Sequence, residues 1–444
     1  MLLALLVWLG LAFFLGFLLR HGLARKRPAL VAFTIVLALV SLPRPFIFML
    51  GLDPPMPASH FGGVDWQLVS RALLFCLLWA VAVSMSYLIN GRMARPLAPL
   101  LPRGGGTLPS GARVALVLLA PAVFAVVGTG FLLAQAGGLS AFIMASKLEK
   151  ALAGYFIFKE SARLAAILAL FGYLSLRADT APAAHWGRLA CLLTGSIMVI
   201  CTLLWGARYD FLLMSAVVLL AWRFHVGPIG VVRLALFAGA LFCAAYALRI
   251  IRAEILVKLA TSLPPQPFWR QLSAGMHFVQ FDALMLVIRD AGDVFAFRWG
   301  ADFVNGMQSW IPRSLFPEKE TFHIGPWFRR VYQPMARNGW PVTTVGAWYL
   351  NFGIIGILLG AYVSGLALRI WDEAFDCMRQ SPWQASVGAA LSVYMFEAGI
   401  GTGFPQDVIL LIVPLWLAAL FLFGPQMRSQ KSRSVPRAAA RRAG

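Results

Sequence analysis

Long apolar runs of about 20 residues recur along this chain, separated by short polar or glycine- and proline-rich breaks. A run of that length is what an α-helix needs to cross a lipid bilayer. Of the 444 residues 60% are hydrophobic and only 13% are charged, whereas a soluble domain has about 25% charged residues. The pattern excludes an ordinary water-soluble domain, a disordered chain and a small disulfide-rich domain. It also differs from the short alternating segments of an outer-membrane barrel.

The runs predict an all-α polytopic membrane protein with about eleven transmembrane helices and one large ordered extracytoplasmic loop. Helices one to eight would occupy residues 1–250, the loop with its amphipathic helices 251–343, helices nine to eleven 344–423, and a basic cytoplasmic tail 424–444. No basic segment precedes the first run, so we expect a retained helix and not a cleaved signal peptide. The predicted spans are 1–19, 29–51, 67–90, 114–136, 160–176, 189–205, 211–222, 231–250, 344–368, 385–401 and 407–423.

The distribution of basic residues predicts the orientation of the chain. The formal net charge is +20, from 38 Lys and Arg against 18 Asp and Glu. If the N-terminus lies outside, twenty of these bases fall in cytoplasmic segments, whereas the short outer loops 52–66, 206–210 and 402–406 carry only Arg208. This asymmetry follows the positive-inside rule. It accounts for the basic composition without a nucleic-acid partner.

The predicted outer segment 249–343 departs from that rule because it carries eleven bases. Within it, Phe278, Phe281, Met285 and Ile288 fall near one helical face, which predicts an amphipathic helix at the membrane interface. Several aromatic residues follow. Since a long ordered loop in a compact protein is usually functional, we expect the site to lie here.

The densest chemical signal lies in residues 311–320 of this loop and just after it. Arginine presents a planar donor fork to phosphate or pyrophosphate oxygens, and lysine adds a point charge. The segment therefore predicts an anion site, and the alternative is a basic loop that contacts lipid headgroups. Its charged and titratable residues are Arg313, Glu318, Lys319, Glu320, His323, Arg329 and Arg330.

Two arginines outside this loop have competing interpretations. Arg208 either meets an anion, pairs with the nearby Asp210 or snorkels to the interface. Arg44, near the outer end of the second span, is expected to snorkel, with a cavity-facing position as the alternative.

No metal or cofactor is expected. The six histidines show no i, i+4 pairing or cysteine companions, and no outer loop contains an Asp-X-Asp pair.

Three segments resemble the Wzy-type O-antigen and oligosaccharide repeat-unit polymerases. They are "GARYDFLLMSAVVLL" at 206–220, "WIPRSLFPEKE" at 310–320 and "PVTTVGAWYLNFGIIGILLG" at 341–360. The likeness extends to the order of the spans and to the long outer loop before the closing helices. It implies a GT-C-like glycosyltransferase or ligase architecture in the bacterial inner membrane, with a periplasmic N-terminus and a cytoplasmic C-terminus.

The resemblance implies a metal-independent transferase that moves a growing glycan from undecaprenyl pyrophosphate to a lipid-linked repeat unit. The expected partners are that lipid-linked oligosaccharide, membrane lipids, a chain-length regulator and a flippase. The alternatives are an O-antigen ligase, a flippase or transporter of lipid-linked oligosaccharide, and a non-catalytic scaffold. The expected roles are pyrophosphate binding by Arg208, Arg313, Lys319, Arg329 and Arg330, acid–base catalysis by Glu318, Glu320 or His323, and sugar stacking by Trp310, Trp327 and Tyr349.

Overall fold

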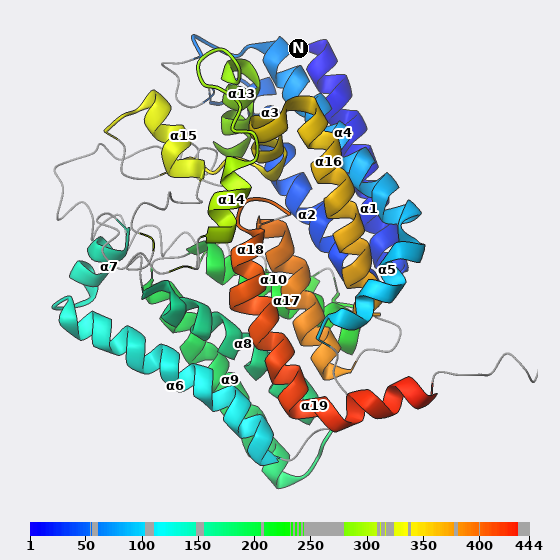
Figure 1. Cartoon of the computed structure of the whole chain (residues 1–444), viewed down its shortest axis with the longest axis vertical. Helices are drawn as coiled ribbons and strands as arrows, with labels where there is room; N and C mark the ends of the chain where they lie inside the picture. The colour runs from blue at the N-terminus through cyan, green and yellow to red at the C-terminus, as the bar shows by residue number, and fades with distance from the viewer. Residues whose placement is uncertain are drawn as a thin grey trace, which may run out of the picture.

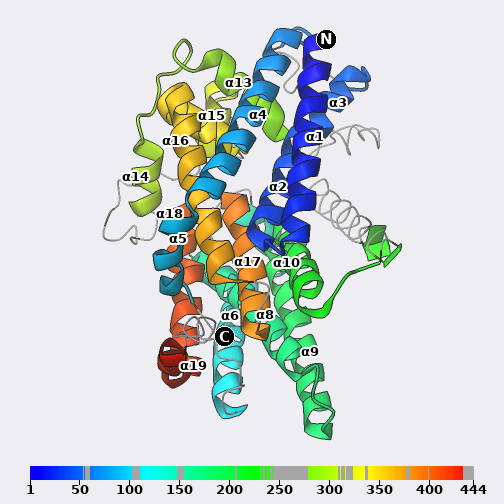
Figure 2. The same cartoon turned by 90° about the vertical axis from the view of Figure 1, so that its right-hand side faces the viewer.

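The computed structural model describes residues 1–53, 55, 61–102, 111–147, 155–205, 208–230, 279–308, 311, 316, 324–335, 339–376, 381–398 and 400–433, with short pieces between 232 and 243. These residues form helices and no β-strand, as predicted (Figure 1). The N-terminus lies near α13 in both views (Figures 1 and 2).

The described residues of the first half of the chain form ten α-helices. They are α1 (Leu2–Ala24), α2 (Pro28–Ser41), α3 (Pro43–Met49), α4 (Trp66–Ile89), α5 (Gly91–Leu97), α6 (Gly111–Gln135), α7 (Leu139–Lys147), α8 (Phe156–Leu176), α9 (Pro182–Leu204) and α10 (Arg208–Ala221), with a 3₁₀ turn at Ala98–Leu100 and a π-helical turn at Trp222–Val226.

From residue 279 on, the described residues form three short helices and then the closing bundle helices. The short ones are α13 (Val279–Asp290), α14 (Ala301–Gln308) and α15 (Ile324–Tyr332), and the closing ones are α16 (Thr344–Ala374), α17 (Pro382–Ala398), α18 (Phe404–Asp407) and α19 (Val413–Arg433), with a π-helical turn at Val408–Ile412.

Seven helical segments of the described chain are long and apolar enough to cross a membrane, which confirms the multi-pass character that the apolar runs predict. They are Leu2–Ala24, Pro28–Met49, Trp66–Ile89, Ala112–Gln135, Pro182–Leu204, Thr344–Ala374 and Phe404–Gly424.

The helices α8, α10 and α17 coincide with three further predicted spans. α8 carries Lys159, Glu160 and Arg163 near its start, and α10 and α17 have only 14 and 17 residues. Residues 231–250, the remaining predicted span, lie largely outside the described residues. The total of eleven spans therefore stays a prediction.

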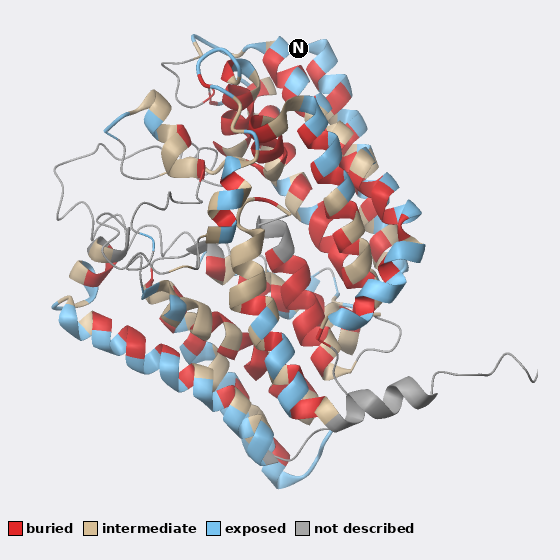
Figure 3. Cartoon of the chain, in the orientation of Figure 1, coloured by how far each residue is buried: buried red, intermediate tan, exposed pale blue. Residues whose placement is uncertain are grey.

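The packing of α1 shows how an almost uniformly apolar helix divides between protein and lipid. Its buried residues, from Ala4 to Gly22, recur every three or four positions, so they form one helical stripe. Its other face exposes large apolar side chains such as Phe13, which is 82% exposed. Exposed apolar residues also line much of α6 (Figure 3). An apolar exterior of this kind suits a bilayer as the surrounding solvent.

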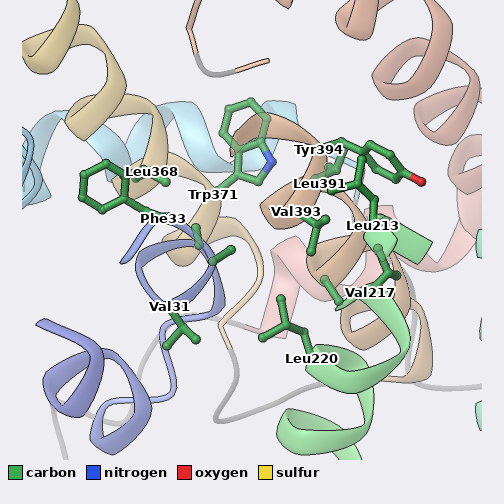
Figure 4. Close-up of a cluster of buried hydrophobic side chains, with 14 of the residues drawn as sticks. Val31, Phe33, Leu213, Val217, Leu220, Leu368, Trp371, Leu391, Val393 and Tyr394 are labelled. Atoms are coloured by element: carbon green, nitrogen blue, oxygen red, sulfur yellow. The ribbon is translucent and has the colours of Figure 1, made fainter. Parts of the chain in front are cut away.

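The centre of the bundle lies where four helices from distant parts of the sequence meet. Phe33 of α2, Leu220 of α10, Trp371 of α16 and Val393 of α17 belong to one buried cluster (Figure 4). Gly365 of α16 permits a close approach to α4, because a Cβ there would lie 2.4 Å from the carbonyl oxygen of Val83. Small residues at such contacts are typical of helix packing in membranes.

A fully buried carboxylate joins three of these helices at the end of the bundle opposite α13. Asp372 of α16 accepts hydrogen bonds from the Ala29 backbone N–H at the start of α2 (2.9 Å) and from the Tyr87 hydroxyl of α4 (2.8 Å). The acceptor satisfies one of the N–H groups that a helix start leaves without an intrahelical partner. A negative charge is also favourable at that helix terminus.

A second buried charge cluster corrects the prediction that Arg44 snorkels to the interface. The Arg44 side chain is 0% exposed, and it donates to Asp53 (2.7 Å) and to Asp282 of α13 (2.9 Å). The Phe48 ring also lies 4.8 Å from its guanidinium. The two carboxylates compensate the charge of the guanidinium, so the arginine can stay buried and does not need to extend to the interface.

The same contact accounts for the position of α13. The sequence predicts this helix at the membrane interface, but Asp282 ties it to α3, and its residues Phe281 to Val287 are all buried. Figure 1 shows α13 beside α3 and α16 at one end of the bundle.

We expect Arg44→Ala to destabilise the folded chain by about 3–5 kcal/mol, because the substitution leaves two buried carboxylates without their cation. Unfolding of the detergent-solubilised protein by heat or denaturant measures the effect. Arg330→Ala, at an exposed position, is the control and should change stability by less than about 0.5 kcal/mol. Equal stability of Arg44→Ala and the wild type would contradict the structural role of the cluster.

Candidate functional site

The site is built around a break in α16. Gly353 has φ 63° and ψ −147°, so the element consists of a helix from Thr344 to Phe352 and a second helix that begins after the glycine. Residues other than glycine rarely adopt this conformation. The two parts fold closely together, because a Cβ on Gly360 would lie 2.3 Å from the Trp348 indole. The predicted span 344–368 is therefore interrupted, and its first part belongs to the site.

The break leaves backbone carbonyls that need hydrogen-bond donors, and a neighbouring turn supplies them. The backbone N–H groups of Arg298 and Trp299 donate to the carbonyls of Leu350 and Asn351, each at 3.1 Å. The Gly300 N–H donates to the Asn351 side-chain oxygen at 3.0 Å. Asn351 itself is 0% exposed. The turn at 298–300 and the broken helix thus hold each other in place.

A charged side chain in this turn is held by its neighbours. Arg298 donates to Asp302 of α14 at 2.7 Å, and the other oxygen of Asp302 accepts from Asn351 at 3.0 Å. The guanidinium of Arg298 also lies 4.5 Å from the ring centre of Trp327 in α15. One arginine therefore connects α14, α15 and the broken helix.

The helix α15 presents the arginines that the sequence predicts. Its Phe328 is fully buried against Phe295 and Trp340, which anchors the helix to the rest of the site. Arg329 lies 5.3 Å from the ring centre of Trp340 and donates to the Gln333 side chain at 3.0 Å, and burial lowers its pKa. Arg330 is exposed, and no carboxylate among the described residues pairs with it.

A further arginine lies at the end of α13. Arg289 pairs with Asp290 at 2.6 Å and lies 5.2 Å from the Phe61 ring centre. Its hydrogen bond with Asp290 is the main reason that its pKa is raised. The Tyr332 hydroxyl of α15 donates to the same carboxylate. We call Arg289, Arg298, Arg329 and Arg330 the arginine cluster.

A second charged group, the α10 cluster, gathers Lys159, Glu160, Arg163 and Asp210. Asp210 at the start of α10 accepts from Arg163 (2.6 Å) and Lys159 (2.7 Å) of α8, and Arg163 also pairs with Glu160 at 2.9 Å. The Asp210 carboxylate is therefore bound by side chains from another helix, and a local pair with Arg208 is not needed to compensate its charge. α10 begins at Arg208, whose side chain lies outside the described part of the structure.

The contact between α14 and α18 links the two clusters. Gly306 of α14 packs so closely on the loop before α18 that a Cβ would lie 2.0 Å from the Thr402 carbonyl oxygen. At the end of α18, the carboxylate of Asp407 interacts electrostatically with Arg163. Both views show α14 next to α18 (Figures 1 and 2).

Of the site residues predicted from sequence, the structure gathers four in one region: Trp327, Arg329, Arg330 and Tyr349. Trp327 packs edge-to-face on Phe295, and Tyr349 packs on Phe75 and Phe297, so each is partly used in packing. Those that lie outside the described residues are Trp310, Arg313, Glu318, Lys319, Glu320 and His323.

Sequence reasoning missed Arg289, Arg298, Asp302 and Asn351. One signal was present for the pair Arg298 and Asp302, whose i, i+4 spacing is typical of a helical ion pair. Asn351 carried no such signal, because its partners lie about 50 residues earlier in the chain.

We expect Gly353→Ala to lower stability by about 1–3 kcal/mol, because alanine is strained at this backbone conformation. The nearest atom to a Cβ there is 3.9 Å away, so a steric clash would not explain the loss. Thermal unfolding in detergent measures it, with Gly10→Ala as the control, since a Cβ on Gly10 meets nothing within 4 Å. A melting temperature for Gly353→Ala at or above that of the control would rule out strain at the break.

Comparison of the chain with protein-family models, with curated proteins and with solved structures finds no match. Any assignment of function to this chain therefore rests on its sequence and on the arrangement of its described residues.

Proposed function

We propose that the chain is a polysaccharide polymerase that transfers a growing glycan from undecaprenyl pyrophosphate to a lipid-linked repeat unit on the outer face of the cytoplasmic membrane. The observation that carries the proposal is the arginine cluster, held together with Trp327 and Tyr349 at one end of an apolar helix bundle. The bias of basic residues supports an outer position for that end of the bundle.

The chemistry that such a site would perform is displacement at a sugar carbon. A hydroxyl of the acceptor sugar attacks the anomeric carbon of the donor, and its proton passes to a base. The bond from that carbon to the pyrophosphate oxygen breaks, and undecaprenyl pyrophosphate leaves with the electron pair. Negative charge develops on the leaving group, so fixed cations placed around it lower the barrier.

The residues divide into roles by their chemistry. The residues proposed to bind the pyrophosphate are Arg208, Arg313, Lys319, Arg329 and Arg330. The guanidinium groups stay protonated and offer paired donors, and the lysine adds a point charge. Arg289 and Arg298 have carboxylate partners, so we assign them to positioning of the loop. Glu318, Glu320 and His323 remain the candidates for the base. Trp327 and Tyr349 offer ring surfaces for sugars at the rim of the cluster.

The test is reconstitution of the purified chain in liposomes with a defined undecaprenyl-pyrophosphate-linked repeat unit. A ladder of longer lipid-linked glycans supports the polymerase. Transfer of the glycan to an added lipid A core would indicate a ligase. Movement of the sugar across the bilayer without elongation would indicate a flippase and contradict the proposal. The absence of both glycan elongation and sugar movement would favour a scaffold.

We expect Arg208→Ala and Arg313→Ala to abolish elongation, and Arg330→Ala to reduce its rate by about 10²-fold, the usual effect of losing one donor to a developing anion. All three variants should express and unfold like the wild type. Arg20→Ala, an exposed position near the opposite end of α1, is the control and should elongate normally. Near-normal chain synthesis by any of the three variants would remove that residue from the pyrophosphate site.

A further inference from the structure

Arg71 lies near the start of α4, at the end of the bundle that carries α13. The helix begins at Trp66, and Asp65 caps it by accepting from the Gln67 and Leu68 backbone N–H groups. At a rise of about 1.5 Å per residue, Arg71 lies only a few ångströms inside the helix start. Its side chain is exposed, and Leu74, which shares its helical face, is 43% exposed. This face of α4 therefore points away from the bundle.

Four aromatic residues form a continuous strip beside Arg71. The ring centres are 5.3 Å apart between Phe75 and Tyr349, 6.1 Å between Tyr349 and Phe297, and 6.1 Å between Phe297 and Trp299. Arg71 lies one helical turn before Phe75 in α4, at the Phe75 end of the strip, and its charge also acts on the Tyr349 phenol. We call these four residues the aromatic strip.

Trp299, at the other end of the strip, is 75% exposed and has φ 47°, an uncommon value for a residue other than glycine. Its backbone N–H donates to the Asn351 carbonyl at the break in α16, which holds it in this conformation. Maintaining an exposed indole in a strained backbone conformation indicates a function outside the folded core.

The strip continues the apolar outer surface of α16. Directly after the break, Ile354 and Ile355 are 53% and 75% exposed. Tryptophan and tyrosine concentrate where the hydrocarbon core of a bilayer meets the headgroups. The composition of the strip therefore favours a position near the lipid headgroups for the strip and Arg71.

The charge of Arg71 needs an anion at that depth. No carboxylate among the described residues pairs with it. A charged side chain in a lipid-facing position is costly unless it meets a counter-charge. A phosphate group beside an apolar tail supplies that charge, and the tail fits the exposed leucine and aromatic surface next to it.

We propose that Arg71 and the aromatic strip bind the phosphate of an outer-leaflet lipid, with the lipid tail along α4. The preference for a polyprenyl phosphate over a bulk phospholipid rests on the proposed function. The site would then hold a lipid-linked sugar next to Tyr349, which belongs to the strip and also packs against the buried cluster that includes Phe328 of α15.

Native mass spectrometry of the purified chain in detergent, titrated with three lipid probes, tests this site. The probes are undecaprenyl phosphate, phosphatidylglycerol and farnesol, an isoprenoid without phosphate. We expect Arg71→Ala to weaken undecaprenyl phosphate binding about tenfold or more, as loss of a charge-assisted hydrogen bond does, and Arg71→Lys to keep most of it. Arg113→Ala removes another exposed arginine, at the start of α6, and serves as the matched control.

Each binding result either supports or overturns the lipid site at Arg71. Weaker binding of undecaprenyl phosphate alone supports the site and identifies a polyprenyl ligand. Weaker binding of phosphatidylglycerol as well supports the site with any lipid phosphate as ligand. Binding by Arg71→Ala equal to that by Arg113→Ala, or farnesol binding as tight as that of undecaprenyl phosphate, overturns it. Thermal unfolding of each variant checks that a loss of binding is not a loss of fold.

The lipid site and the proposed function fail in different ways. If Arg71→Ala binds both phosphate lipids normally while the wild type still forms a glycan ladder, the lipid site is wrong and the polymerase stands. If Arg71→Ala loses the lipid but the wild type forms no ladder from a defined donor, the lipid site stands and the polymerase is wrong.

Discussion

The break in α16 at Gly353 is the feature on which the whole candidate site depends. In an apolar surrounding, a helix that stops must find donors for its last carbonyls. Here the turn at 298–300 supplies them, and the Asn351 side chain accepts from the Gly300 N–H and donates to Asp302. The position of Arg298, of Trp299 and of α14 follows from that exchange. The hydrogen bonds thus fix the conformation of the turn and satisfy the carbonyls at the end of the first part of α16.

Charge pairing explains why so many ionic groups are tolerated in a chain that is only 13% charged. Arg44 has two carboxylates, Asp210 has two cations, and Asp302 is shared between an arginine and an amide. Each group is compensated by a residue from another element, so these pairs also determine which elements meet. Arg330 and Arg71 have no carboxylate partner among the described residues, and the two proposals assign an anion to each of them.

The all-helical, multi-pass character could be predicted from the sequence, because apolar runs of bilayer length are recognised from local composition alone. The helix around Phe281 and Met285 was also visible as a periodic pattern, and α13 confirms it. Its burial was not predictable, since the partner of Asp282 lies 238 residues away in sequence. For the same reason the snorkelling assigned to Arg44 was wrong. The interruption of the span at Gly353 was missed as well, because glycine alone does not distinguish close packing from a break.

The bond between Asp372 and the start of α2 has a consequence for how the chain is made. The two partners are 343 residues apart, so the first hairpin of helices leaves the ribosome and enters the membrane long before its capping carboxylate exists. During that time the Ala29 N–H has to use water or lipid headgroups at the membrane surface. Once the end of α16 has been made, Asp372 replaces those temporary partners. The insertion of α16 is therefore the step that completes the start of α2.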